Sequence, residues 1–147
     1  SYSYMNNNYT FNEFSENKFL SNYNITQAIT FGVAYTNNSF KISAGLNWHS
    51  GRPISEPVSG NEIINNEINF GGINESSLKD YLRIDVSAIY NFMISKKHKA
   101  NLGLSIWNVL DKENEINSFY RVNNNMVNQS IQRSLGLTPN AVVRVRF

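Results

Sequence analysis

Apolar and polar residues alternate one for one in five segments of the chain, each of roughly ten residues. Such alternation is typical of β-strands with one apolar face, because successive side chains of a strand point to opposite sides. A length of about ten residues is also what a tilted strand needs to cross a lipid bilayer. The segments are 26–35, 39–48, 81–92, 100–110 and 141–147, and residues 1–5 would end a sixth strand.

Segment 39–48 shows the pattern most clearly. Its apolar face carries Phe40, Ile42, Ala44, Leu46 and Trp48, and its other face carries Ser39, Lys41, Ser43, Gly45 and Asn47. Segment 81–92 sets apolar residues against Arg83 and Asp85, so its second face must meet water or pair with protein. Between the first two segments, Asn37 and Asn38 predict a tight hairpin turn, since Asn tolerates positive φ.

The connections alternate in length, which predicts an up-and-down meander with its long loops at one end. Residues 6–25, 49–80 and 111–137 are long connections, and residues 37–38 and 95–99 are short ones. Outer-membrane barrels have short periplasmic turns and long extracellular loops. A soluble sandwich has no reason to gather its long loops at one end. The Asn-rich stretches 6–8, 65–66 and 123–125 all fall in the long loops and suit exposed, solvated chain.

The predicted fold class is therefore all-β, an antiparallel up-and-down transmembrane β-barrel. Six strands cannot close such a barrel, because the smallest single-chain examples have about eight. An open sheet would also expose unpaired backbone groups to lipid. We therefore expect residues 1–147 to be the C-terminal part of a larger barrel domain, or one of several chains that complete a barrel.

Composition agrees with this interpretation and removes several alternatives. Charged residues make up 16% and aromatics 13%, and mean hydropathy is −0.39, which a barrel with a polar lumen and loops tolerates. A net charge of +2 with scattered basic residues gives no nucleic-acid footprint. Without cysteine there is no disulfide or thiolate site. No apolar run is long enough for a transmembrane helix, and no signal peptide opens the chain.

Two sets of residues stand out as candidate functional positions. Aromatic residues near strand ends predict the interfacial belts of a membrane protein, although aromatics also favour strands in general. The belt candidates are Tyr35, Phe40, Trp48, Tyr90, Phe92 and Trp107. Charged residues on the second face are candidates to face the lumen, where they would line a passage or form ion pairs with the wall or a plug. They are Lys41, Arg83, Asp85, Arg144 and Arg146.

Nothing in the sequence indicates an enzyme, a metal site or a cofactor. His49 and His98 fall at opposite ends of the predicted barrel, and the acidic residues after 110 lack the spacing of a calcium loop. The long loop 49–80, with Arg52, is of a length that is often functional, but its residue types select no ligand.

The order of three motifs resembles the C-terminal end of TonB-dependent outer-membrane receptors, most of all those of Bacteroidota. These motifs are a Tyr-x-Arg-x-Asp strand start at residues 81–85, Asn-Val-Leu-Asp-Lys at residues 108–112, and a final strand ending at Phe147. Ser-Gly-Arg-Pro at residues 50–53 is similar to a further element of the family. The sequence departs from the family at Val109, where Leu is more frequent.

This resemblance implies a barrel of about 22 strands around a plug domain, in the bacterial outer membrane. It implies uptake of a scarce nutrient such as a ferric siderophore, cobalamin or a glycan, energised through TonB, ExbB and ExbD. Phe147 would be the C-terminal signal read by the barrel assembly machinery, and a surface lipoprotein is a further partner.

Two other classes of protein remain open at this point. One is a structural or adhesive outer-membrane barrel without a plug. The other is a soluble ligand-binding β-barrel or sandwich with its apolar face turned inward, which would be soluble without detergent. The transported substrate cannot be read from these residues.

Overall fold

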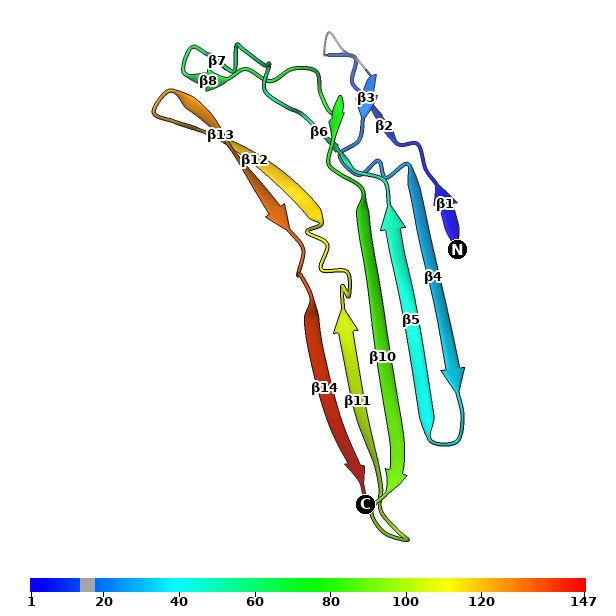
Figure 1. Cartoon of the computed structure of the whole chain (residues 1–147). Coiled ribbons are helices and arrows are strands. Elements are labelled where there is room, and N and C mark those ends of the chain that lie inside the picture. The colour runs from blue at the N-terminus through cyan, green and yellow to red at the C-terminus, as the bar shows by residue number, and fades with distance from the viewer. Residues whose placement is uncertain (14–17) are drawn as a thin grey trace.

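In the computed structural model, which describes residues 1–13 and 18–147, every regular element of the described chain is a β-strand (Figure 1). The strands that form the main sheet are β1 (Tyr2–Tyr4), β4 (Gln27–Thr36), β5 (Phe40–His49), β10 (Tyr81–Met93), β11 (Lys99–Trp107) and β14 (Thr138–Arg146). The shorter ladders use β2 (Asn8–Thr10), β3 (Lys18–Leu20), β6 (Pro53–Ile54), β7 (Ile63–Ile64), β8 (Glu67–Ile68), β9 (Ser76–Ser77), β12 (Glu115–Asn123) and β13 (Met126–Arg133).

The six-stranded main sheet has the order β1-β4-β5-β10-β11-β14, and every pair in it is antiparallel. This is the meander that the alternating segments predict, and the all-β antiparallel class is confirmed. The three long connections leave one end of the sheet, while the two short turns and the C-terminus lie at the other (Figure 1).

Strand ends differ from the prediction where the backbone turns. The segment expected to run to residue 110 ends at Trp107, because Asn108 takes a φ of 51° that no strand accommodates. The β4–β5 turn forms where expected but by another device. The backbone N–H groups of Ser39 and Phe40 donate to Asn37 Oδ1 at 2.9 and 2.7 Å, so the Asn37 side chain closes the turn without positive φ.

The long connections carry strands of their own, which the interpretation of them as solvated loops missed. The largest addition is the hairpin β12–β13, and its turn residues Asn124 and Asn125 have φ of 50° and 57°. Asn65 and Asn66 make the same kind of turn between β7 and β8, with φ of 52° and 67°. These Asn pairs therefore serve as left-handed hairpin turns, which Asn adopts more readily than most residues.

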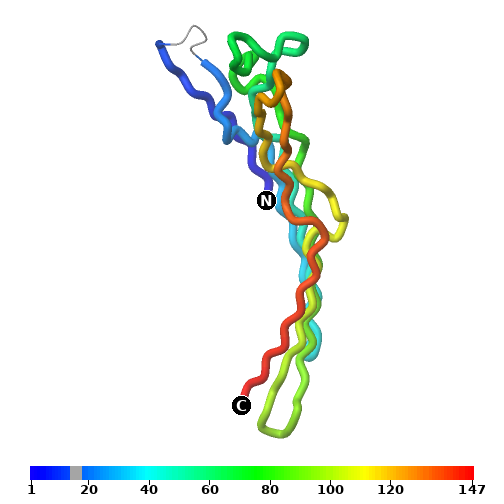
Figure 2. The backbone as a smooth tube through the Cα atoms, turned by 90° about the vertical axis from the view of Figure 1, so that its left-hand side faces the viewer, coloured from blue at the N-terminus to red at the C-terminus, as the bar shows by residue number. Residues whose placement is uncertain are grey.

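The main sheet is a single layer, open on both faces and at both edges (Figure 2). The described chain has only Leu78 and Ala100 as buried hydrophobic residues, so it contains no core of ordinary size. Its accessible surface is 10627 Å², whereas a compact folded chain of 16.8 kDa exposes about 7,700 Å². The chain thus exposes about 3,000 Å² more than a compact chain of its mass, and much of this surface is apolar side chains on the sheet.

Candidate functional site

The register of the main sheet assigns each strand residue to one of two faces. Over the five long strands, one face carries only apolar and aromatic residues, apart from Gln27 at the start of β4. Across the sheet, Val33 lies opposite Ala44, Ala44 opposite Val86, and Val86 opposite Ile106. Rows above and below continue in the same way. The apolar face carries Ile29, Phe31, Val33, Tyr35, Phe40, Ile42, Ala44, Leu46, Trp48, Leu82, Ile84, Val86, Ala88, Tyr90, Phe92, Ala100, Leu102, Leu104, Ile106, Pro139, Ala141, Val143 and Val145.

This face is exposed in the isolated chain. Phe31 is 63% exposed and Val143 68%, although neither side chain gains anything from contact with water. Contiguous apolar surface of this extent is a mark of contact with lipid or protein. No charged residue of the described sheet lies on it.

The opposite face is mixed: polar and small residues stand beside a few apolar ones such as Ile89 and Val142, and it holds all five of the predicted charged positions. Arg83 lies opposite Asn47, Asp85 opposite Gly45, and Lys41 follows on the same side of β5. Arg144 and Arg146 lie on the same side, opposite Asn101 and Lys99. That these residues share a face follows from the register, whereas their position in a lumen stays a prediction.

Arg83 and Asp85 form an ion pair within one strand. Arg83 Nη2 and Nε each lie 3.0 Å from Asp85 Oδ2, and Asp85 Oδ1 accepts the backbone N–H of Asn108 at 2.9 Å. Both carboxylate oxygens are therefore occupied. Arg83 and Asp85 therefore pair with each other within the sheet, whereas a place for them in a barrel wall stays a prediction.

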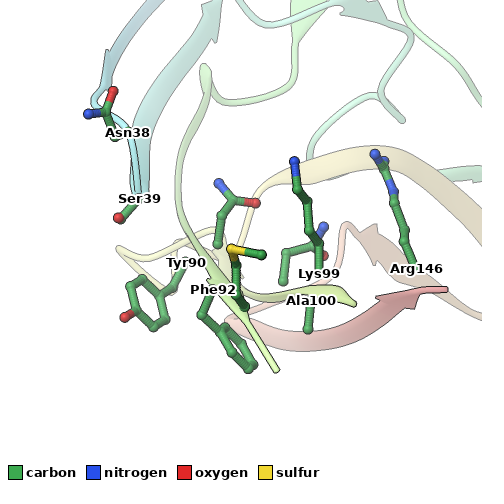
Figure 3. Close-up of a pocket in the computed structure, with 10 residues that line it drawn as sticks. Asn38, Ser39, Tyr90, Phe92, Lys99, Ala100 and Arg146 are labelled. Atoms are coloured by element: carbon green, nitrogen blue, oxygen red, sulfur yellow. The ribbon is translucent and has the colours of Figure 1, made fainter. Parts of the chain in front are cut away.

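The cations at the short-turn end have no such partner. Lys41, Lys99, Arg144 and Arg146 form no ion pair within the described part of the chain. Lys99 and Arg146 border an open cavity of about 720 Å³ on this side. Figure 3 shows their side chains pointing one way and those of Tyr90 and Phe92 the other, so the polar and apolar faces separate within one view.

Five of the six belt candidates lie on the apolar face, near the ends of their strands. At the short-turn end, Phe40 stacks on Tyr90 with ring centroids 4.6 Å apart, and Tyr90 on Phe92 at 5.6 Å. Tyr35, near the last residue of β4, also lies at the short-turn end, and Trp48 lies at the opposite end of β5.

Trp107 does not belong with this group, and its assignment is corrected by the register. Ile106 pairs with Val86 on the apolar face, so Trp107, the next residue of an unbroken strand, points to the polar face. There it borders a hollow shared with Asp85 and Gly45. A position near a strand end therefore does not predict a residue on the apolar face unless the alternation agrees.

Gly32 and Gly45 leave a bare strip beside Asp85 on the polar face. The two glycines lie opposite each other, and a Cβ added to either would meet only backbone oxygen, at 3.8 and 3.9 Å. Packing within this chain therefore does not require glycine here. A missing side chain at such a place allows another backbone to approach the sheet closely.

The corner between β11 and β12 is held by two buried Asn side chains, each 1% exposed. Asn108 Nδ2 donates to the carbonyls of Lys112 and Leu135 at 3.0 and 3.1 Å. Asn114 exchanges two hydrogen bonds with the backbone of Leu82, at 2.8 and 2.9 Å. Asn114 thus replaces the strand neighbour that β10 lacks once β11 has ended, a role that no local sequence pattern predicts.

An ion pair ties the base of the β12–β13 hairpin to the start of β10. Lys79 Nζ lies 2.9 Å from Glu115 Oε1, and the Glu115 side chain is largely enclosed while that of Lys79 is exposed. The hydrogen bond from Lys79 lowers the pKa of Glu115 below its usual value, against the opposing effect of burial. The hairpin is therefore attached by a contact that depends on an ionised carboxylate.

Phe147 follows β14 and is 97% exposed, with its ring 5.4 Å from that of His98 in the neighbouring turn. His49, at the loop end, stacks on Tyr81 at 4.8 Å. The two histidines thus lie at opposite ends of the sheet, as expected.

Comparisons of the chain with protein-family models, with characterised proteins and with solved structures find no match. Within residues 1–13 and 18–147, no helix is long and apolar enough to cross a membrane.

Proposed function

We propose that this chain forms part of the wall of a transmembrane β-barrel in the bacterial outer membrane, and more narrowly part of a TonB-dependent receptor that takes up a scarce nutrient. One observation carries the barrel proposal: the apolar face of the main sheet holds no charged residue, while the opposite face holds Lys41, Arg83, Asp85, Arg144 and Arg146. Lipid on one side and an aqueous or protein-filled lumen on the other account for both faces together.

The dimensions of the apolar face suit a bilayer. Along β10 the face runs from Leu82 to Phe92, about ten steps or about 34 Å of antiparallel strand. At the tilt of about 40° usual for membrane barrels, this covers about 26 Å, close to the apolar band of about 25 Å on known barrels. Stacked aromatics at the short-turn end and Trp48 at the other end occupy the two levels where interfacial rings are expected.

The lengths of the connections at the two ends of the sheet support one orientation in the membrane. Outer-membrane barrels keep their long loops outside the cell and their short turns in the periplasm. The connections that carry β2–β3, β6–β9 and β12–β13 are therefore proposed as extracellular, and the β4–β5 and β10–β11 turns as periplasmic (Figure 1). Phe147 then lies at the periplasmic edge, where the barrel assembly machinery would read it.

The open edges favour a larger barrel over a complete one. β1 and β14 each have one sheet neighbour, so one row of backbone groups on each strand remains to be paired. Further strands of the same barrel, about 22 in all in the receptors that the motifs resemble, would pair them. The bare strip at Gly32 and Gly45 and the unpaired cations near the short turns suit contact with a plug.

The narrower proposal rests on the resemblance of residues 81–85, 108–112 and 147 to the receptor family. Two of these motifs meet in space, since the backbone N–H of Asn108 donates to Asp85 and the side chain of Asn108 to Lys112. Motifs that are distant in sequence but hydrogen-bonded together are expected to occur together. Under this proposal TonB, ExbB and ExbD act through the plug, and a surface lipoprotein would meet the extracellular loops.

Migration on a gel with and without heating tests the membrane proposal, with the intact mass of the protein from native membranes measured alongside. We expect a species that needs detergent, migrates faster before heating than after, and is several times heavier than 16.8 kDa. A monomer of 16.8 kDa that stays soluble without detergent would instead mean that the apolar face is turned inward in a soluble β-protein. If the protein is a large barrel but its mass and peptides include no plug domain, the barrel proposal stands and the receptor proposal is wrong.

A further inference from the structure

The loop end of the chain contains a cavity that none of the roles above uses. Three long connections meet there: the chain after β3, the segment around β6, and the start of β12. The cavity has a volume of about 320 Å³, within the range of small-molecule sites, about 300–1,000 Å³. Its walls include Asn22, Arg52, Phe70, Asn117, Phe119 and Tyr120.

Arg52 is the only charged residue among those that line this cavity, and its guanidinium is only partly satisfied. Nη2 donates to Asn117 Oδ1, whereas Nε is buried and has no hydrogen-bond partner in the described chain. A buried donor on a charged group is costly to leave unpaired, by about 1–3 kcal/mol or more. Nε has almost no accessible surface, so a ligand in the cavity would meet the rest of the guanidinium, whose Nη1 has no partner in the described chain.

The two amides that line the cavity beside Arg52 also have unused donors. Asn117 Oδ1 accepts from Arg52 and from the backbone N–H of Ser118, and Asn22 Oδ1 accepts from Asn74. Their Nδ2 groups have no partner in the described part of the chain. The free groups on three separate segments are thus all N–H donors. They suit a ligand whose acceptor oxygens are spread around its body and include a negative charge.

Aromatic rings form the apolar side of the cavity. Phe70 and Tyr120 meet edge to face with centroids 6.0 Å apart, which fixes both rings, and Phe119 remains half exposed beside them. Flat apolar surfaces next to a few polar groups bind ring-shaped ligands and set their orientation.

We propose that this cavity binds a sugar acid, that is, a carbohydrate ring that carries a carboxylate. The carboxylate accepts from Arg52 Nη1, oxygens of the sugar accept from Asn22 and Asn117, and a face of the ring lies against the aromatic side chains. A neutral sugar would leave Arg52 without a charge partner, and an aromatic acid would offer no oxygens to the amides. The inference would name a substrate class for the proposed receptor, but it rests on loop residues alone and is tested separately from membrane insertion.

The test is a binding titration of the whole protein in detergent, followed by ligand-observed NMR, with glucuronate, glucose and benzoate as probes. We expect glucuronate to bind at least tenfold more tightly than either of the other two. Arg52→Gln should lower the affinity for glucuronate to that for glucose. The matched control is Arg133→Gln, because Arg133 lies in the same loop layer but pairs with Glu113 at 3.0 Å outside the cavity.

A second variant keeps the test decisive if Arg52→Gln does not fold. Asn117→Asp keeps the oxygen that accepts from Arg52 and Ser118 but replaces the free Nδ2 donor with a negatively charged carboxylate. The affinity for glucuronate should therefore fall more than tenfold, and the affinity for glucose should change little. Heat-dependent migration on a gel reports folding in each case, independently of binding. The proposal is overturned if glucose or benzoate binds as tightly as glucuronate, if glucuronate does not bind, or if Arg133→Gln weakens it as much as Arg52→Gln.

Discussion

A lysine placed on either side of the same strand measures directly which face of the sheet meets lipid. Val33 lies on the apolar face, opposite Ala44, and Ala44 is midway along β5 between Phe40 and Trp48. Val33 is therefore at the middle of the apolar band. Ala34 is the next residue and points to the polar face, opposite Ser43. Both side chains are exposed in the isolated sheet, so steric crowding does not distinguish Val33→Lys from Ala34→Lys.

The expected free-energy difference follows from the position of Val33 in the band. A lysine on the lipid face of a membrane barrel costs about 2–4 kcal/mol at the bilayer midplane and about 0–1 kcal/mol near its edges. For Val33→Lys this lowers the folding equilibrium constant by about 30- to 700-fold. For Ala34→Lys, where the lysine enters an aqueous or polar space, we expect a change of about 0.5 kcal/mol or less.

The assay is reversible unfolding of the whole protein by guanidinium in phospholipid vesicles, followed by tryptophan fluorescence. Trp48 and Trp107 report from opposite faces of the sheet. Equal losses for the two variants, or a larger loss for Ala34→Lys, would refute the assignment of the apolar face to lipid. A chain that remains folded without vesicles or detergent would refute it independently.

Three further predictions concern the loop layer. Asn114→Ala removes both hydrogen bonds to the backbone of Leu82 at a buried site and should lower the free energy of unfolding by about 1–3 kcal/mol. Asn114→Gln should not restore this free energy. Chemical denaturation measures the free energy of unfolding in both variants. The pKa of Glu115 is lowered in the folded protein, so its stabilising bond to Lys79 is present above the unfolded pKa and is lost as the pH falls through the lower folded value. Hydrogen exchange in β12–β13 should accordingly accelerate below a pH of about 4.5, and Glu115→Gln should already exchange fast at neutral pH and show no such step; an identical step in that variant would exclude the contact as the cause. Asn124→Ala should destabilise the β12–β13 hairpin by about 1 kcal/mol, because alanine is strained at a φ of 50°, whereas Asn124→Gly should be tolerated; equal hydrogen-exchange rates in the two variants would show that turn strain does not limit the hairpin.

Sequence periodicity was sufficient for the main sheet because a strand's side chains have a fixed repeat of two. Each alternating segment is a strand of the main sheet. The alternation predicts that the charged residues share one face, and the register confirms this for Lys41, Arg83, Asp85, Arg144 and Arg146. The same rule, applied strictly, also assigns Trp107 to the polar face. The prediction for Trp107 was wrong because nearness to a strand end does not determine which face a side chain occupies, whereas the repeat of two does.

The loop strands were missed because their sequences do not alternate in hydrophobicity. Asn117, Ser118 and Phe119 of β12 give no period of two, and a bulge between Glu115 and Asn117 shifts the register. The available signal was the pair Asn124-Asn125, since adjacent Asn residues favour the left-handed conformation that a tight hairpin turn needs.

The sequence by itself determined the strands of the main sheet, their antiparallel order and which residues share a face, because these depend on neighbours one or two residues apart and on the lengths of the connections. Only the tertiary structure decided where β11 ends, which Asn side chains are buried, and that Asn22, Arg52 and Asn117 meet in one cavity. Those features depend on contacts between segments up to 65 residues apart, such as Arg52 with Asn117. No local pattern specifies a contact of that kind, since either partner would suit solvent equally well before the chain folds.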